Sequence, residues 1–425
     1  MSQLQHDGMS RFIIGVYGVG HVLNDLCSAA WFNYLLYFLN DVLRISSAAA
    51  GSVMLVGQIC DGIATPIVGY YSDKMSTRIG KRMPWYILGT CIVPTCFFFI
   101  WQDCYICAEG NETALQVVWY SFFAGAFNIG WAMVQISHMS LTNSLTPVKR
   151  RRDVMIGLRT GFTYVANVAV LLLAFIMFKT VDTPKTQFSL LAILTIAVGL
   201  LLNVLFIVVI KEVRLSAQAN QSYQDNISLR SPDSPNTIGS MFEHVTWRQW
   251  LSQGSMYPVG LVYMLARLGN NVSSSMMPFY LTTVLAFGGV SNPSDATKHT
   301  PWELALIPLI QYVGSVITSW VLERAGRKYS RKLVYSLGAV ITVCGSLPLF
   351  VSPTQFLTRP MRYSMVAFAF LLGVGFSIQL VTAMAFIADF IGPYGASGAF
   401  VYGSISLMDK FCSGIVLFLM MVTNI

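Results

Sequence analysis

Hydrophobic residues in this chain form long runs separated by short polar connections. At ~1.5 Å rise per residue, about 20 helical residues cross the ~30 Å hydrocarbon core of a bilayer. Several runs are longer than that, which indicates tilted or protruding helices. The pattern predicts an all-α polytopic membrane protein. Its eleven expected spans are residues 12–40, 47–72, 84–102, 115–145, 154–178, 187–210, 255–286, 302–322, 333–351, 362–390 and 397–422.

Composition agrees with a membrane protein. The chain is 55% hydrophobic and only 11% charged, whereas about a quarter of the residues of a soluble domain are charged. The net charge of +8 comes from short basic clusters between the apolar runs. Such clusters are typical of topology signals, so we expect no nucleic-acid partner. Residues 1–12 are polar and no small-residue cleavage site follows, so the first span is expected to stay in the protein.

The basic residues also predict an orientation. The connections after spans two, four, six and eight hold seventeen Lys and Arg, and those after odd-numbered spans hold six. This bias predicts that the N-terminus and the even-numbered connections are cytosolic.

The connection after span three would then face the other side. It contains the acceptor Asn111-Glu112-Thr113, so we expect glycosylation at Asn111. Cys104 and Cys107 in the same connection are either a disulfide or two solvent-facing thiols.

A polar stretch divides the chain. Residues 211–250 are predicted to be a flexible cytosolic linker between an N-terminal half (1–210, six spans) and a C-terminal half (251–425, five spans). Each half places an acid at a span end before a Gly and a basic cluster, a repetition that indicates duplicated units. We interpret these residues as a cytosolic gate, although for any single one a topology role is the simpler explanation. The gate residues are Asp73, Arg78, Lys81, Glu323 and Arg327.

Three ionisable residues are predicted near the middle of the membrane. Asp25 lies about thirteen residues into its span, Asp61 about fourteen and Lys410 about thirteen. Charges at that depth normally face a bundle interior or a watery cavity and mark function. Two acids and one base would leave an unequal charge for a cation, a proton or a substrate amine to balance.

Polar residues at similar depths are further candidates for the substrate site. Asn24, Asn128 and Tyr402 could contact a solute, as could Gln135 and Tyr164, but each is also explained as contact between helices. Arg159 lies about six residues into span five, where snorkelling to the interface is the alternative role. Arg267 lies deeper and needs an acidic or carbonyl partner that the sequence does not identify.

Two stretches carry a family resemblance. GQICDGIATPIVGYYSDKMSTRIGKRMPWYILGT (57–90) and ADFIGPYGASGAFVYGSISLMDKFCSGI (388–415) resemble the glycoside-pentoside-hexuronide:cation symporter branch of the major facilitator superfamily. The resemblance implies the two-half major facilitator fold and a sugar and cation site at Asp25, Asp61 and Lys410, with Arg159 near it. Thr65 and Asn128 stand where the family has further acids. This departure favours proton coupling or facilitation over sodium or sugar coordination.

Three other segments narrow the resemblance. GHVLNDLCSAAWFNYLLYFL, GWAMVQISHMSL and DFIGPYGASGAFVYGS are similar to members of this superfamily that import cysteine into lysosomes and melanosomes. The resemblance implies an alternating-access transporter, not an enzyme, with cysteine as substrate. The alternatives are a cation-coupled sugar symporter and a non-transporting scaffold. We expect a monomer in the bilayer with no bound cofactor, and co-transported H⁺ or Na⁺ stays open. The family pattern has twelve helices, so the twelfth is expected to be missing from this chain.

Overall fold

The structure is a computed structural model, and almost all of the chain it describes is helical. The described residues are 10–107, 113–146, 149–218, 247–285, 287, 300–325, 329–347, 359–391 and 398–423. Within these ranges no β-strand occurs, in agreement with the predicted all-α class.

Every predicted apolar run is mainly helical over its described residues. Eight helical stretches are long and apolar enough to cross a membrane, and the described parts of the runs at 255–286, 302–322 and 333–351 are helical but do not meet that criterion. The count of eleven spans therefore stays a prediction. The helices are α1 (Arg11–Val19), α2 (Val22–Tyr37), α3 (Ser47–Lys74), α4 (Met83–Ile100), α5 (Thr113–Leu145), α6 (Lys149–Thr180), α7 (Pro184–Val209), α9 (Trp247–Ser252), α10 (Met256–Phe279), α11 (Glu303–Ala325), α12 (Arg331–Ser346), α13 (Arg359–Ile391) and α14 (Gly398–Thr423).

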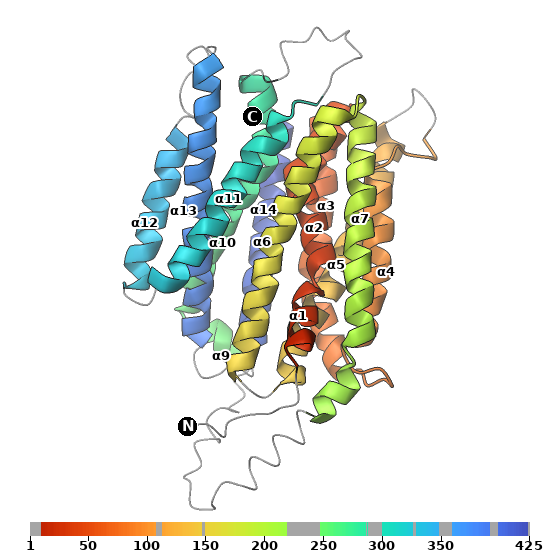
Figure 1. The fold of residues 1–425 in the computed structure, drawn as a ribbon, viewed down its shortest axis with the longest axis vertical. Coiled ribbons are helices and arrows are strands. Elements are labelled where there is room, and N and C mark those ends of the chain that lie inside the picture. Colours follow the sequence, from red (N-terminus) through yellow and green to blue (C-terminus); the bar gives the residue numbers. More distant parts are fainter. Residues whose placement is uncertain are drawn as a thin grey trace, which may run out of the picture.

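The long helices run side by side along the long axis of the molecule (Figure 1). α1 begins at the lower end of this view and α14 ends at the upper end. α1 and α2 run in the same direction and α3 runs back, so the connection between α3 and α4 lies at the lower end and that between α2 and α3 at the upper end. The basic connections identified in the sequence therefore share the lower end.

Both edges of the predicted linker are helical. Residues 212–218 continue as a short helix after α7, and α9 packs its buried Trp250 against the C-terminal half. Residues 219–246 lie outside the described residues.

Among the described buried residues, the apolar core shared by the two halves lies at one end. A large cluster contains the core of α1–α7 together with the upper parts of α10, α11, α13 and α14, including Leu281, Leu304 and Leu417. At the lower end, Trp250, Ile387 and Ile405 belong to a separate small cluster formed by the C-terminal half. Hydrophobic packing thus closes the interface between the halves at the upper end and leaves their lower cores separate.

The first long helix of each half ends in the same way. α2 passes into a π-helical turn, η1 (Phe38–Val42), and α10 passes into η3 (Tyr280–Val284). The N–H of Leu43 donates to the carbonyl of Phe38 at 2.9 Å, and that of Leu285 donates to Tyr280 at 3.1 Å. Because π-helical turns are rare, their equivalent placement shows an internal repeat.

Candidate substrate site

The first predicted span is not one continuous helix. α1 ends at Val19 and α2 begins at Val22, with Gly20 and His21 in a turn between them. A Cβ atom on Gly20 would lie 2.3 Å from the Phe206 ring of α7, so only glycine fits this close approach. Interrupted helices are where transporters often place their binding sites.

Two carbonyl groups at the break accept hydrogen bonds from side chains inside the protein. The Tyr86 hydroxyl donates to the Gly20 carbonyl at 2.5 Å. Nε2 of His138 lies 2.8 Å from the Tyr17 carbonyl and donates to it, and the two rings are stacked. Unpaired backbone groups are costly within a membrane, so these two side chains stabilise the break.

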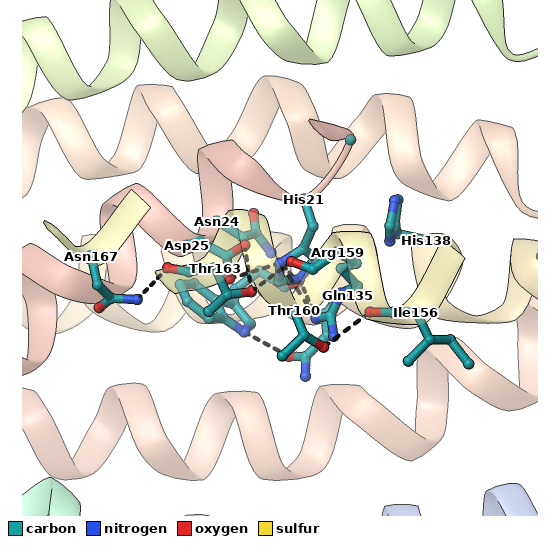
Figure 2. A network of polar contacts seen from close by, with 12 residues as sticks. His21, Asn24, Asp25, Gln135, His138, Ile156, Arg159, Thr160, Thr163 and Asn167 are labelled. Carbon is teal, nitrogen blue, oxygen red and sulfur yellow. Dashed lines mark hydrogen bonds and ion pairs between the residues drawn. The ribbon is translucent and has the colours of Figure 1, made fainter. Parts of the chain in front are cut away.

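Asp25 belongs to a polar network that starts at this break (Figure 2). Nδ1 of His21 lies 3.0 Å from one Asp25 oxygen, and the Thr163 hydroxyl donates to the other at 3.1 Å. Nη2 of Arg159 lies 3.2 Å from Nε2 of His21. A carboxylate accepts, so Nδ1 of His21 donates to Asp25. Nη2 of Arg159 also lies 3.4 Å from Nδ1, so it contacts the ring at both nitrogens and does not lie along the Nε2 lone pair. Arg159 therefore points into the bundle, and snorkelling does not describe its position.

Asp61 and Lys410 form an ion pair between the two halves. Nζ of Lys410 on α14 lies 2.5 Å from Oδ1 of Asp61 on α3, and it also donates to the Thr65 hydroxyl at 3.1 Å. Thr65 donates in turn to Asp61 at 3.3 Å. Both charged side chains are less than a tenth exposed.

The three charges named from the sequence do not form one cluster. In the described part of the chain, no hydrogen bond or ion pair joins Asp25 to Asp61 or to Lys410. Asp25 is held entirely within the N-terminal half, whereas the other two residues connect the halves.

A third acid–base pair lies in the C-terminal half. Nε of Arg267 on α10 lies 3.2 Å from Oδ2 of Asp409 on α14. The Ser413 hydroxyl donates to the other Asp409 oxygen at 3.3 Å and accepts from Asn271 at 3.1 Å. Asp409 is the partner that sequence reasoning could not name for Arg267. The sequence could have indicated Asp409, because it is an acid directly before Lys410 in an apolar run.

Positive and negative charges are balanced in the interior. Asp61 pairs with Lys410 and Asp409 with Arg267, and Asp25 is linked to Arg159 through His21, so these described contacts hold three acids and three bases. The expectation of an unequal charge counted only Asp25, Asp61 and Lys410, whereas these described contacts add Asp409, Arg159 and Arg267. A balanced interior suits a solute without net charge.

The other predicted contact residues make contacts within one helix or between helices. Asn24 donates to the Trp131 carbonyl at 3.1 Å, and Asn128 donates to the carbonyl of Ala124 one turn earlier at 2.8 Å. Tyr402 packs on the small apolar cluster at the lower end. These contacts neither require nor exclude a role in substrate binding.

The predicted gate lies largely outside the described side chains. The backbones of Asp73 and Glu323 are in helices, but their side chains and all of Arg327 lie outside the description. Arg78 and the Lys81 side chain are exposed. The gate therefore stays a prediction.

Glu212 is a lower-end contact that sequence reasoning missed. Its buried carboxylate accepts from the backbone N–H groups of Lys81, Arg82 and Met83 at 2.9 to 3.2 Å. It caps the start of α4, where an acid also complements the helix dipole. The segment after α7 is thereby fixed to the connection between α3 and α4.

The connection after α4 contains the residues predicted to face away from the cytosol. Cys104 and Cys107 form a disulfide, which decides between the two sequence readings. Asn111 lies outside the described residues, so its glycosylation stays a prediction.

Comparison with known proteins identifies the family. Residues 16–423 match the model of the family described as MFS/sugar transport protein. The chain belongs to the major facilitator superfamily. It is 32% identical over 416 residues to Major facilitator superfamily domain-containing protein 12 of Mus musculus, covering 94% of this chain and 82% of that protein. The protein of the same name from Homo sapiens is also 32% identical, over 421 residues. A mouse sphingosine-1-phosphate transporter, MFSD2B, is 31% identical over only 138 residues.

Solved structures show the same fold. A D-xylose-proton symporter superposes with a TM-score of 0.66 at 15% identity, covering 96% of this chain and 90% of the symporter. The nucleoside transporter NupG superposes with a TM-score of 0.60 at 13% identity, covering 97% and 91%. This superfamily consists of secondary transporters, so the chain is a membrane transporter and not an enzyme.

Proposed function

We propose that this transporter carries a small zwitterionic amino acid, and specifically that it imports cysteine into the lumen of lysosomes or melanosomes. The supporting observation is the set of three acids and three bases in the described interior: two ion pairs, and Asp25 linked to Arg159 through His21. Support for cysteine and for the organelle comes from the family resemblance of the sequence.

A zwitterion can engage such an interior without adding net charge. Its ammonium group can pair with Asp25 or Asp61, which belong to the N-terminal half, and its carboxylate with Lys410 or Arg267, which belong to the C-terminal half. A solute bridging the halves in this way would favour their closure around it. An ion such as Na⁺ or a proton could accompany it, and the transport assay below can be run with either gradient.

The packing of the halves supports alternating access. Their shared apolar core closes the upper end, and the lower cores are separate. Since the Lys- and Arg-rich connections share the lower end, we assign that end to the cytosol. The disulfide at the upper end agrees with an oxidising lumen.

Uptake of radiolabelled L-cysteine into proteoliposomes tests the proposal. We expect saturable uptake that excess unlabelled cysteine inhibits and that protein-free liposomes lack. Uptake of a hexoside without amino-acid uptake would support the sugar symporter instead. A folded protein that takes up neither would support a scaffold, and staining of lysosomal and melanosomal membranes tests the location.

A further inference from the structure

The internal repeat relates Asp25 to Arg267. Asp25 lies thirteen residues before Phe38, the first residue of η1, and Arg267 lies thirteen residues before Tyr280, the first residue of η3. Both helices are continuous from these charged residues to their π-helical turns. The two halves therefore place opposite charges at equivalent positions on their first long helices.

Asp25 and Arg267 lie at a similar depth, on opposite sides of the interface between the two halves. α2 and α10 touch where the Ser275 hydroxyl donates to the Phe32 carbonyl at 2.9 Å. Asp25 precedes Phe32 by seven residues and Arg267 precedes Ser275 by eight, which puts both about 10–12 Å along their helices toward the lower end. Below this crossing the two halves have separate apolar cores.

Arg267 is the more exposed of the two bases that form ion pairs with a buried acid. In its ion pair the Arg267 side chain is 35% exposed and Asp409 2%, whereas the Lys410 side chain is 9% exposed. Lys410 is already bonded to both Asp61 and Thr65. Among the described contacts, Arg267 uses only Nε, toward Asp409, so its two Nη groups have no protein partner.

We propose that Arg267 binds the carboxylate of the transported amino acid. Asp409 holds the guanidinium through Nε, and the outward Nη groups donate to the solute in the charge-assisted geometry that arginine favours. The acids of the N-terminal half receive the ammonium group. This inference rests on the proposed function and specifies which base recognises the carboxylate.

Two variants separate the effect of the Arg267 guanidinium from that of the Asp409 carboxylate. Asp409→Asn removes the buried acid and keeps Arg267, and Arg267→Gln with Asp409→Asn removes both charges, so neither variant leaves a buried carboxylate unpaired. Inhibition of L-cysteine uptake by cysteamine, which lacks the carboxylate, is compared with inhibition by unlabelled L-cysteine in proteoliposomes.

We expect the unmodified protein and Asp409→Asn to prefer cysteine over cysteamine by roughly tenfold or more, the range of a hydrogen bond between charged groups. The double variant should lose this preference. An unchanged preference in the double variant overturns the inference and leaves cysteine transport intact. No cysteine uptake by the unmodified protein overturns the proposed function, and the inference falls with it.

A further variant covers failure of the double variant to fold. Arg267→Lys keeps a positive charge opposite Asp409 but removes the planar guanidinium, whose paired N–H groups can donate to both oxygens of a carboxylate. It should raise the KM for cysteine severalfold and leave inhibition by cysteamine unchanged. Equal changes for both compounds would indicate a structural role only and overturn the inference.

Discussion

Two buried acid–base groups of this transporter differ in whether they connect the N-terminal half to the C-terminal half. Asp61 and Lys410 pair between the halves, whereas Asp25, His21 and Arg159 are bonded to one another within the N-terminal half. Alternating access moves one half against the other. A pair between the halves is therefore strained or broken in each cycle, and a network within one half can persist through it. We therefore expect the first to control the conformational change and the second to position Asp25.

The largest effect is expected for Lys410→Ala. It leaves Asp61 buried without its partner, a loss that typically costs about 3–5 kcal/mol, and it removes the ionic link between the halves. Cysteine uptake should fall at least about a hundredfold, on the order of 2.7 kcal/mol. Asp61→Asn should lose uptake as well. Uptake and the amount of protein in the membrane are measured together, and wild-type uptake by both variants would remove this pair from the mechanism.

A smaller effect is expected for Asp25→Asn. The carboxamide has nearly the same shape and can still accept from Thr163, but it no longer balances the charge of Arg159. Because the network stays within one half, we expect stability to fall less than in Lys410→Ala. Cysteine uptake should fall roughly tenfold through loss of one charge-assisted interaction. Unchanged uptake with unchanged KM would show that Asp25 serves only the fold.

The helix break predicts a loss of stability for Gly20→Ala. The backbone of Gly20 is right-handed helical and accepts alanine, so the cost arises only from contact with Phe206. Overpacking of this kind costs about 1–3 kcal/mol. Thermal unfolding in detergent measures it against Gly15→Ala on α1, where a Cβ would meet nothing within 4 Å. Equal melting temperatures would contradict the tight fit at the break.

The smallest effect is expected at an exposed Lys–Asp ion pair, which has the same residue types as the buried pair of Lys410 and Asp61. Lys185 lies 2.7 Å from Asp103 at the upper end, and both side chains are more than half exposed. Such pairs contribute about 0.2–1 kcal/mol. Lys185→Ala should leave cysteine uptake unchanged and stability nearly so. A loss of uptake comparable to that of Lys410→Ala would show that burial is not what distinguishes the pair between the halves.

Prediction from sequence succeeded where the signal was local. The described residues of each apolar run are mainly helical, because about 20 apolar residues can satisfy their backbone in a membrane only as a helix. The depth of Asp61 and Lys410 followed from counting residues, and the structure pairs them. Asp25 has a similar depth but different partners, since depth does not say which way a side chain points.

The contacts that sequence reasoning missed join distant segments. Asp409 was overlooked beside Lys410, although it binds Arg267 from more than a hundred residues away. Glu212 was assigned to a flexible linker, yet it caps α4. The break at Gly20 depends on the Phe206 ring of α7 and was hidden in a continuous apolar run.

By itself, the sequence determined the helices, their membrane character and the basic end of the bundle. These properties depend on hydrophobicity and charge along the chain, which are readable residue by residue. Only the tertiary structure decided which acid meets which base, because the partners come from different helices whose rotation and packing no single segment encodes. The balance of charge in the interior is consequently a property of the assembled bundle.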